Sequence, residues 1–180
     1  KDNPILVQSD YGNQSNQGRL RLYITDAPTL LDAVNIVVTR VEVHKTGYDS
    51  TSGWVTIDST TRTHNLLLLT NGASALLGEG SLDAGRYTQI RLIIGEGSTV
   101  VVGGISFQLK IPSGMQTGLK LVHQFEIQSN TLYELMLDFD ASRSIHKDGP
   151  GTYILRPVIR VQALQTSGSI SGTVNPLSAR

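Results

Sequence analysis

The chain has 180 residues, a length sufficient for one domain with a substantial hydrophobic core, and its 15 basic and 15 acidic residues balance. This balance, without blocks of like charge, argues against nucleic acid as a partner. The chain has no cysteine, which excludes disulfides, thiolate metal sites and a cysteine nucleophile. Its longest apolar run, Leu66–Leu69, is far shorter than the roughly 20 residues of a membrane-spanning helix, so we expect no transmembrane segment.

Three regions follow one another along the sequence. Residues 1–18 are polar and rich in Asn, Gln, Ser and Gly, except for Pro4–Val7. This composition predicts an N-terminal tether, with the alternative that Ile5–Val7 adds to the domain as an edge strand. From residue 19 to residue 165 apolar and polar residues alternate between turn-forming residues, as in a β-domain. Residues 166–180 predict a linker and the first strand of a truncated following domain.

The alternation predicts about nine or ten strands in an all-β antiparallel β-sandwich with Greek-key connections, similar to immunoglobulin or transthyretin folds. We expect at most a short helical turn, within Asn71–Gly80. The strand from Ala33 to His44 changes its apolar phase, and this change predicts a β-bulge near Thr39. The Gly103-Gly104 pair predicts a tight hairpin turn, because both residues tolerate positive φ.

Residues 131–161 predict a long hairpin around an ordered loop. The first arm has an apolar face of alternate residues from Tyr133 to Phe139, and the second arm, from residue 152, repeats the pattern. Pro157 lies within the second arm and lacks an amide hydrogen, so we expect a sheet edge or a bulge there. Glu134 is expected to form ion pairs with Arg156 and Arg160 across the hairpin.

Two short motifs have a structural interpretation. Asp83, Gly85 and Tyr87 have the D-x-G-x-Y spacing that resembles the tyrosine corner of immunoglobulin-type sandwiches. Asp138, Asp140 and Ser142 begin like an EF-hand calcium loop, but the glycine and glutamate that such a loop requires at positions six and twelve are missing. We therefore favour Asp140 as the N-cap of a helical turn and keep a metal site as the alternative.

Other candidates for chemistry are few. Glu42 and His44 lie two residues apart, so they share a strand face and could supply two metal ligands, or a catalytic base and the partner that orients it. A solvated strand face is the simpler interpretation. His123 falls on an apolar phase, which favours a hydrogen-bonded core histidine. Trp54 precedes Val55 and Ile57 and is expected in the core. No nucleophile-elbow, zinc-protease, P-loop or dinucleotide motif occurs, and a pair of glycosidase carboxylates leaves no sequence signature.

The chain from Leu20 to Val161 resembles the family known as domain of unknown function 4382. The segments that carry the resemblance are Tyr23–Pro28, Val41–His44, Gly53–Thr56, Leu69–Gly72 with Ala75–Gly78, Ala84–Leu92, Ile111–Gly114 followed by Gly118–Leu121, Leu137–Ile145 and Tyr153–Ile159. The resemblance implies a β-sandwich at the surface of bacteria or archaea, often exported as a lipoprotein and often followed by a carboxypeptidase-regulatory-like module. It implies no catalytic residues.

These observations lead to one main hypothesis and three alternatives. The main one is a non-enzymatic module, extracellular or associated with the prokaryotic cell envelope, that binds a cell-surface or matrix protein or a glycan and needs no cofactor. One alternative is a surface module stabilised by calcium. Another is a fibre subunit that self-associates when Ile5–Val7 completes the open sheet of a neighbouring copy. A hydrolase is the last alternative.

Overall fold

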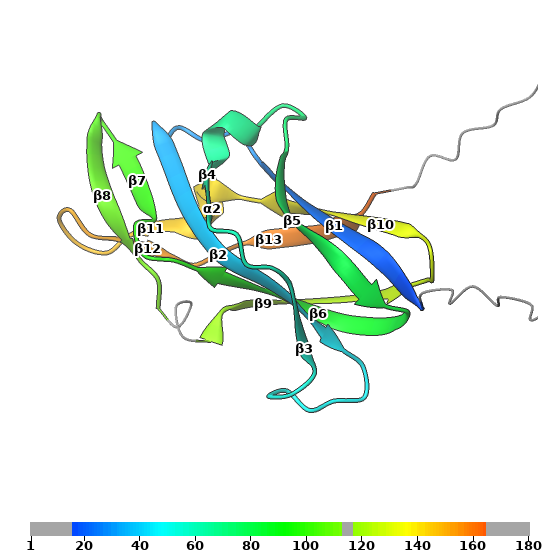
Figure 1. Cartoon of the computed structure of the whole chain (residues 1–180). Helices are drawn as coiled ribbons and strands as arrows, with labels where there is room; N and C mark the ends of the chain where they lie inside the picture. The colour runs from blue at the N-terminus through cyan, green and yellow to red at the C-terminus, as the bar shows by residue number, and fades with distance from the viewer. Residues whose placement is uncertain (1–15, 113–116, 165–180) are drawn as a thin grey trace, which may run out of the picture.

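The computed structural model of the chain describes residues 16–112 and 117–164, which fold into two packed β-sheets (Figure 1). The smaller sheet has the strand order β13-β10-β1-β5. Its strands are β1 (Gln17–Asp26), β5 (Ala75–Asp83), β10 (Leu132–Phe139) and β13 (Ile159–Ala163). The central pair, β1 and β10, runs parallel, and the other two pairs are antiparallel.

The larger sheet has the order β11-β12-β8-β7-β2-β6-β9, with β3 and β4 also paired to β2. Its strands are β2 (Ala33–Lys45), β3 (Trp54–Asp58), β4 (Arg62–Asn65), β6 (Gly85–Ile94), β7 (Thr99–Val102), β8 (Ile105–Lys110), β9 (Leu119–Ile127), β11 (Ile145–Lys147) and β12 (Tyr153–Leu155). Only the β12–β8 pair in this sheet is parallel. Two single turns, η1 (Leu66–Leu69) and α2 (Ala141–Ser144), complete the described elements.

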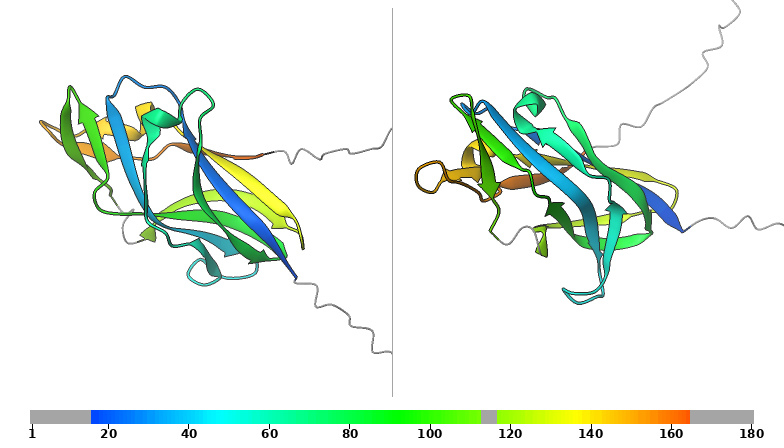
Figure 2. Two further views of the ribbon diagram at one scale, coloured as in Figure 1. Left: turned by 45° about the horizontal axis from the view of Figure 1, so that its top comes forward. Right: turned by 60° about the vertical axis from the view of Figure 1, so that its left-hand side comes forward.

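The hydrophobic core lies between the two layers, which Figure 2 shows from two further directions. In β1 the alternate residues Leu20, Leu22 and Ile24 are buried, and in β10 Leu135 and Leu137 are buried beside them. This is the inner face that the period-two pattern of both strands predicts. None of the described helices is long and apolar enough to cross a membrane.

The structure confirms the predicted all-β sandwich and adds detail. The sheets are mixed, since each contains a parallel pair, and the described part of the chain has thirteen strands rather than nine or ten. The register of β2 against β6 shifts between Val38 and Arg40, so the bulge near Thr39 is confirmed. Gly103 and Gly104 join β7 to β8 with φ of 58° and 76°, as the hairpin prediction requires.

The helical turn expected within Asn71–Gly80 is wrong. Residues from Ala75 onward form β5, and the helical turn is η1, in the preceding leucine run. The glycines of β5 have a packing function instead. A Cβ atom at Gly80 would lie 2.5 Å from the carbonyl oxygen of Ile57, so the absence of a side chain lets β5 approach β3 closely.

The expected hairpin of residues 131–161 is also more complex than predicted. The first arm is β10. The predicted second arm is divided into β13, which pairs with β10 antiparallel, and β12, which belongs to the other sheet. The chain therefore crosses between the layers from Arg156 to Val158, and Pro157 lies in that crossover. Glu134 accepts a hydrogen bond from Tyr23 and pairs with Arg21 rather than with the two predicted arginines.

The chain ends lie mostly outside the described residues. The described chain begins at Asn16, and β1 already includes Gln17 and Gly18 of the predicted tether. The alternative edge strand Ile5–Val7 and the predicted linker and new domain at residues 166–180 both lie outside the part that the structure describes.

Candidate functional site

The outer face of the larger sheet brings together the candidate pair Glu42 and His44, the single tryptophan and several basic side chains. On the side of β2 that faces away from the core, the strand register places His44 opposite Trp54 and Glu42 opposite Arg91. Arg91 in turn lies opposite Lys120 of β9. We call this surface the Trp54 face and define it by Arg40, Glu42, His44, Trp54, Arg91 and Lys120.

Glu42 is the central anion of the Trp54 face. It is only 6% exposed although the sheet face is open. One carboxylate oxygen accepts a hydrogen bond from Nε of Arg91, and the other lies 3.1 Å from Nε of Arg40 and 3.3 Å from Oγ1 of Thr56. A buried carboxylate needs such partners. Both oxygens are therefore engaged by protein donors, and Glu42 is not the solvated side chain that the simpler interpretation predicts.

His44 lies beside Glu42 but has separate partners. Its Nδ1 is 3.2 Å from the hydroxyl of Thr88, and its Nε2 is 2.7 Å from the carbonyl oxygen of Asp49. A neutral ring that donates from Nε2 and accepts at Nδ1 satisfies both contacts. Glu42 and His44 thus share a face, as the spacing predicts, but they do not contact a common third group.

Trp54 is not in the core, contrary to the sequence prediction. The register of β3 turns Ile57 inward and Trp54 outward, because alternate residues of a strand point to opposite faces. The guanidinium carbon of Arg91 lies 3.9 Å from the centre of the indole ring, and Nζ of Lys120 lies 5.7 Å from it. His44 packs edge-on at 5.0 Å. These contacts combine cation–π attraction with aromatic packing.

The loop between β2 and β3 is held by its own hydrogen bonds. The Asp49 carboxylate accepts from the amides of Thr51 and Ser52 and from the Thr51 hydroxyl, and these bonds hold its pKa well below the ordinary value. The indole Nε1 of Trp54 donates to the carbonyl oxygen of Ser50. Tyr48, in the same loop, is 57% exposed, and its side chain lies against Gly53.

The Asp138–Ser142 motif forms a helix cap. Asp140 accepts hydrogen bonds from the Ser142 hydroxyl at 2.7 Å and the Arg143 amide at 3.1 Å, and these bonds lower its pKa. Asp138 instead lies opposite Arg160 on β13. In residues 16–112 and 117–164, no group of three or more His, Asp or Glu side chains is arranged to hold a metal ion.

The tyrosine-corner motif forms the contact that the resemblance implies. Tyr87 is 1% exposed, and its hydroxyl donates to the carbonyl oxygen of Asp83 at 2.9 Å. Gly85 between them has a φ of 140°, which lies in the region that favours glycine. The motif therefore fixes the connection between β5 and β6, which lie in different sheets.

Two other histidines of the described chain have an unpaired ring nitrogen. Nε2 of His64 and Nε2 of His123 are buried and have no hydrogen-bond partner among the described residues. Burial lowers the pKa of both rings. His123 follows the predicted apolar phase and stacks on Phe125, but it is not the hydrogen-bonded histidine that we expected. His146 is exposed on β11.

Asp26 is a candidate that sequence reasoning missed. It is 5% exposed; its Oδ1 accepts from the Ala141 amide at 2.9 Å, and its Oδ2 has no partner among the described residues. Burial raises its pKa to about 6, and the nearby Asp140 and Asp138 add to this effect. The parallel pairing of β1 and β10 brings these acids together, and the sequence pattern of each strand alone does not reveal that pairing.

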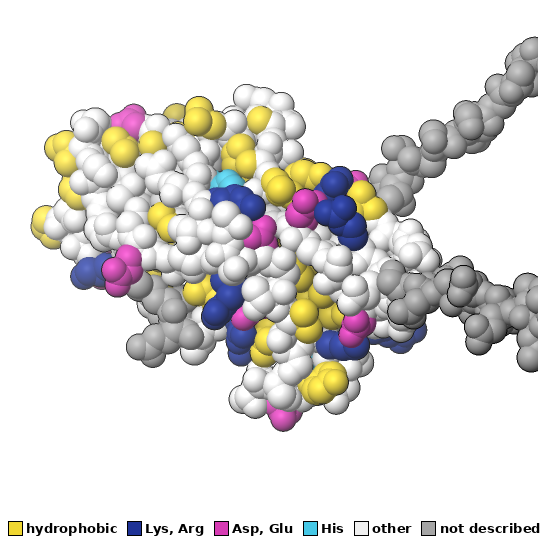
Figure 3. All heavy atoms as spheres, in the orientation of Figure 1, with side chains coloured by type: hydrophobic (Ala, Val, Ile, Leu, Met, Phe, Trp, Pro, Cys, Tyr) yellow, Lys and Arg dark blue, Asp and Glu magenta, His cyan; other side chains and the backbone are white. Residues whose placement is uncertain are grey.

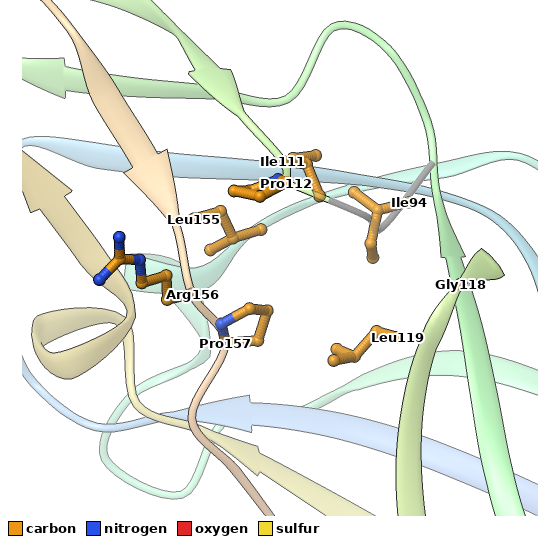
Figure 4. Close-up of a pocket in the computed structure, with 8 residues that line it drawn as sticks. All are labelled: Ile94, Ile111, Pro112, Gly118, Leu119, Leu155, Arg156 and Pro157. Atoms are coloured by element: carbon orange, nitrogen blue, oxygen red, sulfur yellow. The ribbon is translucent and has the colours of Figure 1, made fainter. Parts of the chain in front are cut away.

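A cavity of about 260 Å³ opens where the chain crosses between the sheets (Figure 4). Figure 4 shows Ile94, Ile111, Leu119, Leu155 and Pro157 directed toward one another, whereas the guanidinium of Arg156 points away. The lining is therefore apolar. The cavity is slightly smaller than typical ligand pockets and suits one or two aliphatic side chains.

The sequence was compared with protein families, with curated proteins and with solved structures. The model of the family described as "Domain of unknown function (DUF4382)" matches residues 17–157. The chain belongs to the DUF4382 family. This match covers every described strand except β13 and ends in the crossover that lines the cavity. No curated protein and no solved structure matches the DUF4382 chain.

Proposed function

We propose that this DUF4382 domain is a non-enzymatic binding module of the prokaryotic cell envelope, and that its Trp54 face binds an acidic glycan. The observation that carries the proposal is the indole of Trp54, which has the cations Arg91 and Lys120 within 3.9 and 5.7 Å of its ring centre on one sheet face. Adhesion to a matrix polysaccharide is the role that fits such a surface.

The charge of the Trp54 face supports an anionic partner. Arg40, Arg91 and Lys120 contribute three cations against the single carboxylate of Glu42. The ion pairs among the described residues engage both arginines with Glu42 and leave Lys120 without a carboxylate. Figure 3 shows basic and acidic side chains next to one another on the side of the molecule in view. Complementary charge favours encounter with an acidic ligand and makes binding sensitive to salt.

Preorganisation supports the same proposal. The Glu42 carboxylate fixes Arg91 against the indole, and the hydrogen bonds of Asp49 fix the loop that carries Tyr48. A rigid aromatic surface loses little conformational entropy when a ligand binds. Sugar rings also present apolar C–H faces that pack against aromatic rings.

Binding to immobilised alginate, an acidic polysaccharide, tests the proposal, with neutral dextran as the comparison. We expect the domain to bind alginate and Lys120→Glu to reduce the affinity by about tenfold or more, because one cation is replaced by an anion. Lys110→Glu is the matched control, since Lys110 is an exposed lysine on β8 outside the Trp54 face. Equal retention of wild type and both variants, or equal binding to dextran, would refute the acidic-glycan proposal.

A further inference from the structure

The two sides of the sandwich are closed to different extents. On one side β5 packs against β3, and the backbone of Gly80 touches that of Ile57. On the other side the layers end in β9 and β13, which contact each other across the layers. Among the described strands β9 pairs with β6 alone, and β13 with β10 alone. An edge strand of this kind presents unpaired backbone groups to a further strand.

The open side is apolar. Inward-facing side chains of both edge strands pack on the core but are only partly buried: Leu119 and Leu121 from β9, and Ile159 and Val161 from β13. We call this line of side chains the seam. The apolar cavity lies at one end of the seam, because Leu119 and Pro157 line it. A ligand strand there would find backbone partners along β9 and an apolar pocket for a side chain.

The described chain begins at the other end of the seam. The hydroxyl of Ser129, just after β9, donates to Oδ1 of Asn16, and the amide of Asn130 donates to the carbonyl oxygen of Gln17. β9 itself, from Ile127 back to Leu119, is about 26 Å long at the usual rise per residue. The nine residue-to-residue steps from Asn16 back to Val7 span about 30 Å when extended. Residues before Val7 are therefore within reach of the cavity.

We propose that Ile5–Val7 of the same chain adds to the free edge of β9 as a parallel strand, with Ile5 and Val7 covering the seam at its cavity end. Residues 5–7 form the one run of consecutive aliphatic residues in the polar segment 1–18. Their period-two geometry turns Ile5 and Val7 to one face and Leu6 to the other. Attachment to the same chain gives the segment a high effective concentration at the seam.

A spin label tests this placement on the full chain. The protein has no cysteine, so Leu6→Cys carries a single nitroxide on the outward face of the added strand. We expect the label to remove most of the intensity of the amide signals at the start of β9 and of Leu155, Arg156 and Val158, with little effect on β3. The broadening of the β9 signals should not change on dilution, because the contact is within one chain.

The control carries Ile5→Asp and Val7→Asp in addition to the labelled cysteine. Both substitutions lie outside the described domain, so we expect its fold to be retained and the broadening at β9 to disappear. Equal broadening in the control, or none in either protein, would overturn the proposal. A second experiment tests whether the seam is covered by another copy of the chain. It mixes spin-labelled chain with chain that carries the isotope but no cysteine. Broadening that appears only in this mixture and fades on dilution would assign the seam to a second copy and refute docking within one chain.

Discussion

At the scale of single residues, the most informative side chains are buried polar ones. Glu42 and Asp26 are almost equally buried, at 6% and 5% exposed. Two arginines engage the carboxylate of Glu42, whereas Asp26 has one backbone donor and an oxygen without a described partner. The difference in partners explains why burial raises the pKa of Asp26.

The pKa of Asp26 predicts a pH dependence of stability. It is raised from an ordinary 3.8 to about 6, so the folded state binds the proton more tightly than the unfolded state. This group therefore stabilises the fold most at low pH, and its contribution falls as the pH rises from about 4 to 6. We expect Asp26→Asn, which keeps the acceptor for Ala141, to become more stable relative to wild type by roughly 1–3 kcal/mol between pH 4 and pH 7.

Urea unfolding of both proteins at several pH values measures this difference. Wild type is the reference at each pH, so the contributions of all other titrating groups cancel. If the difference in unfolding free energy between the two proteins is independent of pH, Asp26 titrates as it does in the unfolded chain.

At the scale of elements, the side of the sandwich formed by β3 and β5 depends on glycine. Gly78 and Gly80 both lie against β3, and a Cβ at Gly80 would meet backbone rather than a flexible side chain. Backbone cannot yield cheaply, so this contact fixes the distance between the two strands. The prediction of a helical turn within Asn71–Gly80 was wrong. The alanines and leucines of this segment fit a helix, but its glycines are needed for close packing against β3, which the local sequence does not reveal.

Gly80→Ala is therefore expected to destabilise the domain by roughly 1–3 kcal/mol, since the added methyl group overpacks the contact with Ile57. Ser81→Ala, at the exposed neighbouring position on β5, is the matched control and should change stability by less than about 0.5 kcal/mol. Thermal unfolding of the two variants compares them. An equal effect of both substitutions would mean that β5 does not require close approach to β3.

At the scale of the whole molecule, the described domain is stabilised by its core and by the connections between its layers. Tyr87 fixes the connection of β5 to β6. The buried hydroxyl of Ser144 accepts a hydrogen bond from the amide of Val158, in the crossover from β12 to β13. The Asp140 cap holds the turn that carries Ser144. These contacts hold two of the corners at which the chain passes between the layers.

The calcium alternative makes a measurable claim about the whole molecule. Asp140 already accepts hydrogen bonds from Ser142 and Arg143, and Asp138 lies opposite Arg160. We therefore expect millimolar calcium or excess EDTA to shift the midpoint of thermal unfolding by no more than about 1 °C, because a ligand stabilises only the state that it binds. A clear rise with calcium that EDTA reverses would support the calcium-stabilised module instead.

The sequence by itself determined the features that depend on local pattern. Alternation identified the strands of the sandwich, the phase change located the bulge near Thr39, and the two glycines at 103 and 104 specified a hairpin turn, because each is a property of a few neighbouring residues. The resemblance identified the family for the same reason, through short collinear segments.

Only the tertiary structure decided which strands are neighbours. The parallel pairing of β1 with β10, the crossing of the chain at Pro157 and the assembly of Trp54, Arg91 and Lys120 on one face all join residues that are far apart in sequence. Alternation gives a strand two faces but does not say which of them is covered, and so Trp54 was expected in the core. Burial of Asp26 and the apolar seam between β9 and β13 are likewise consequences of strand order, and strand order is set by packing between layers.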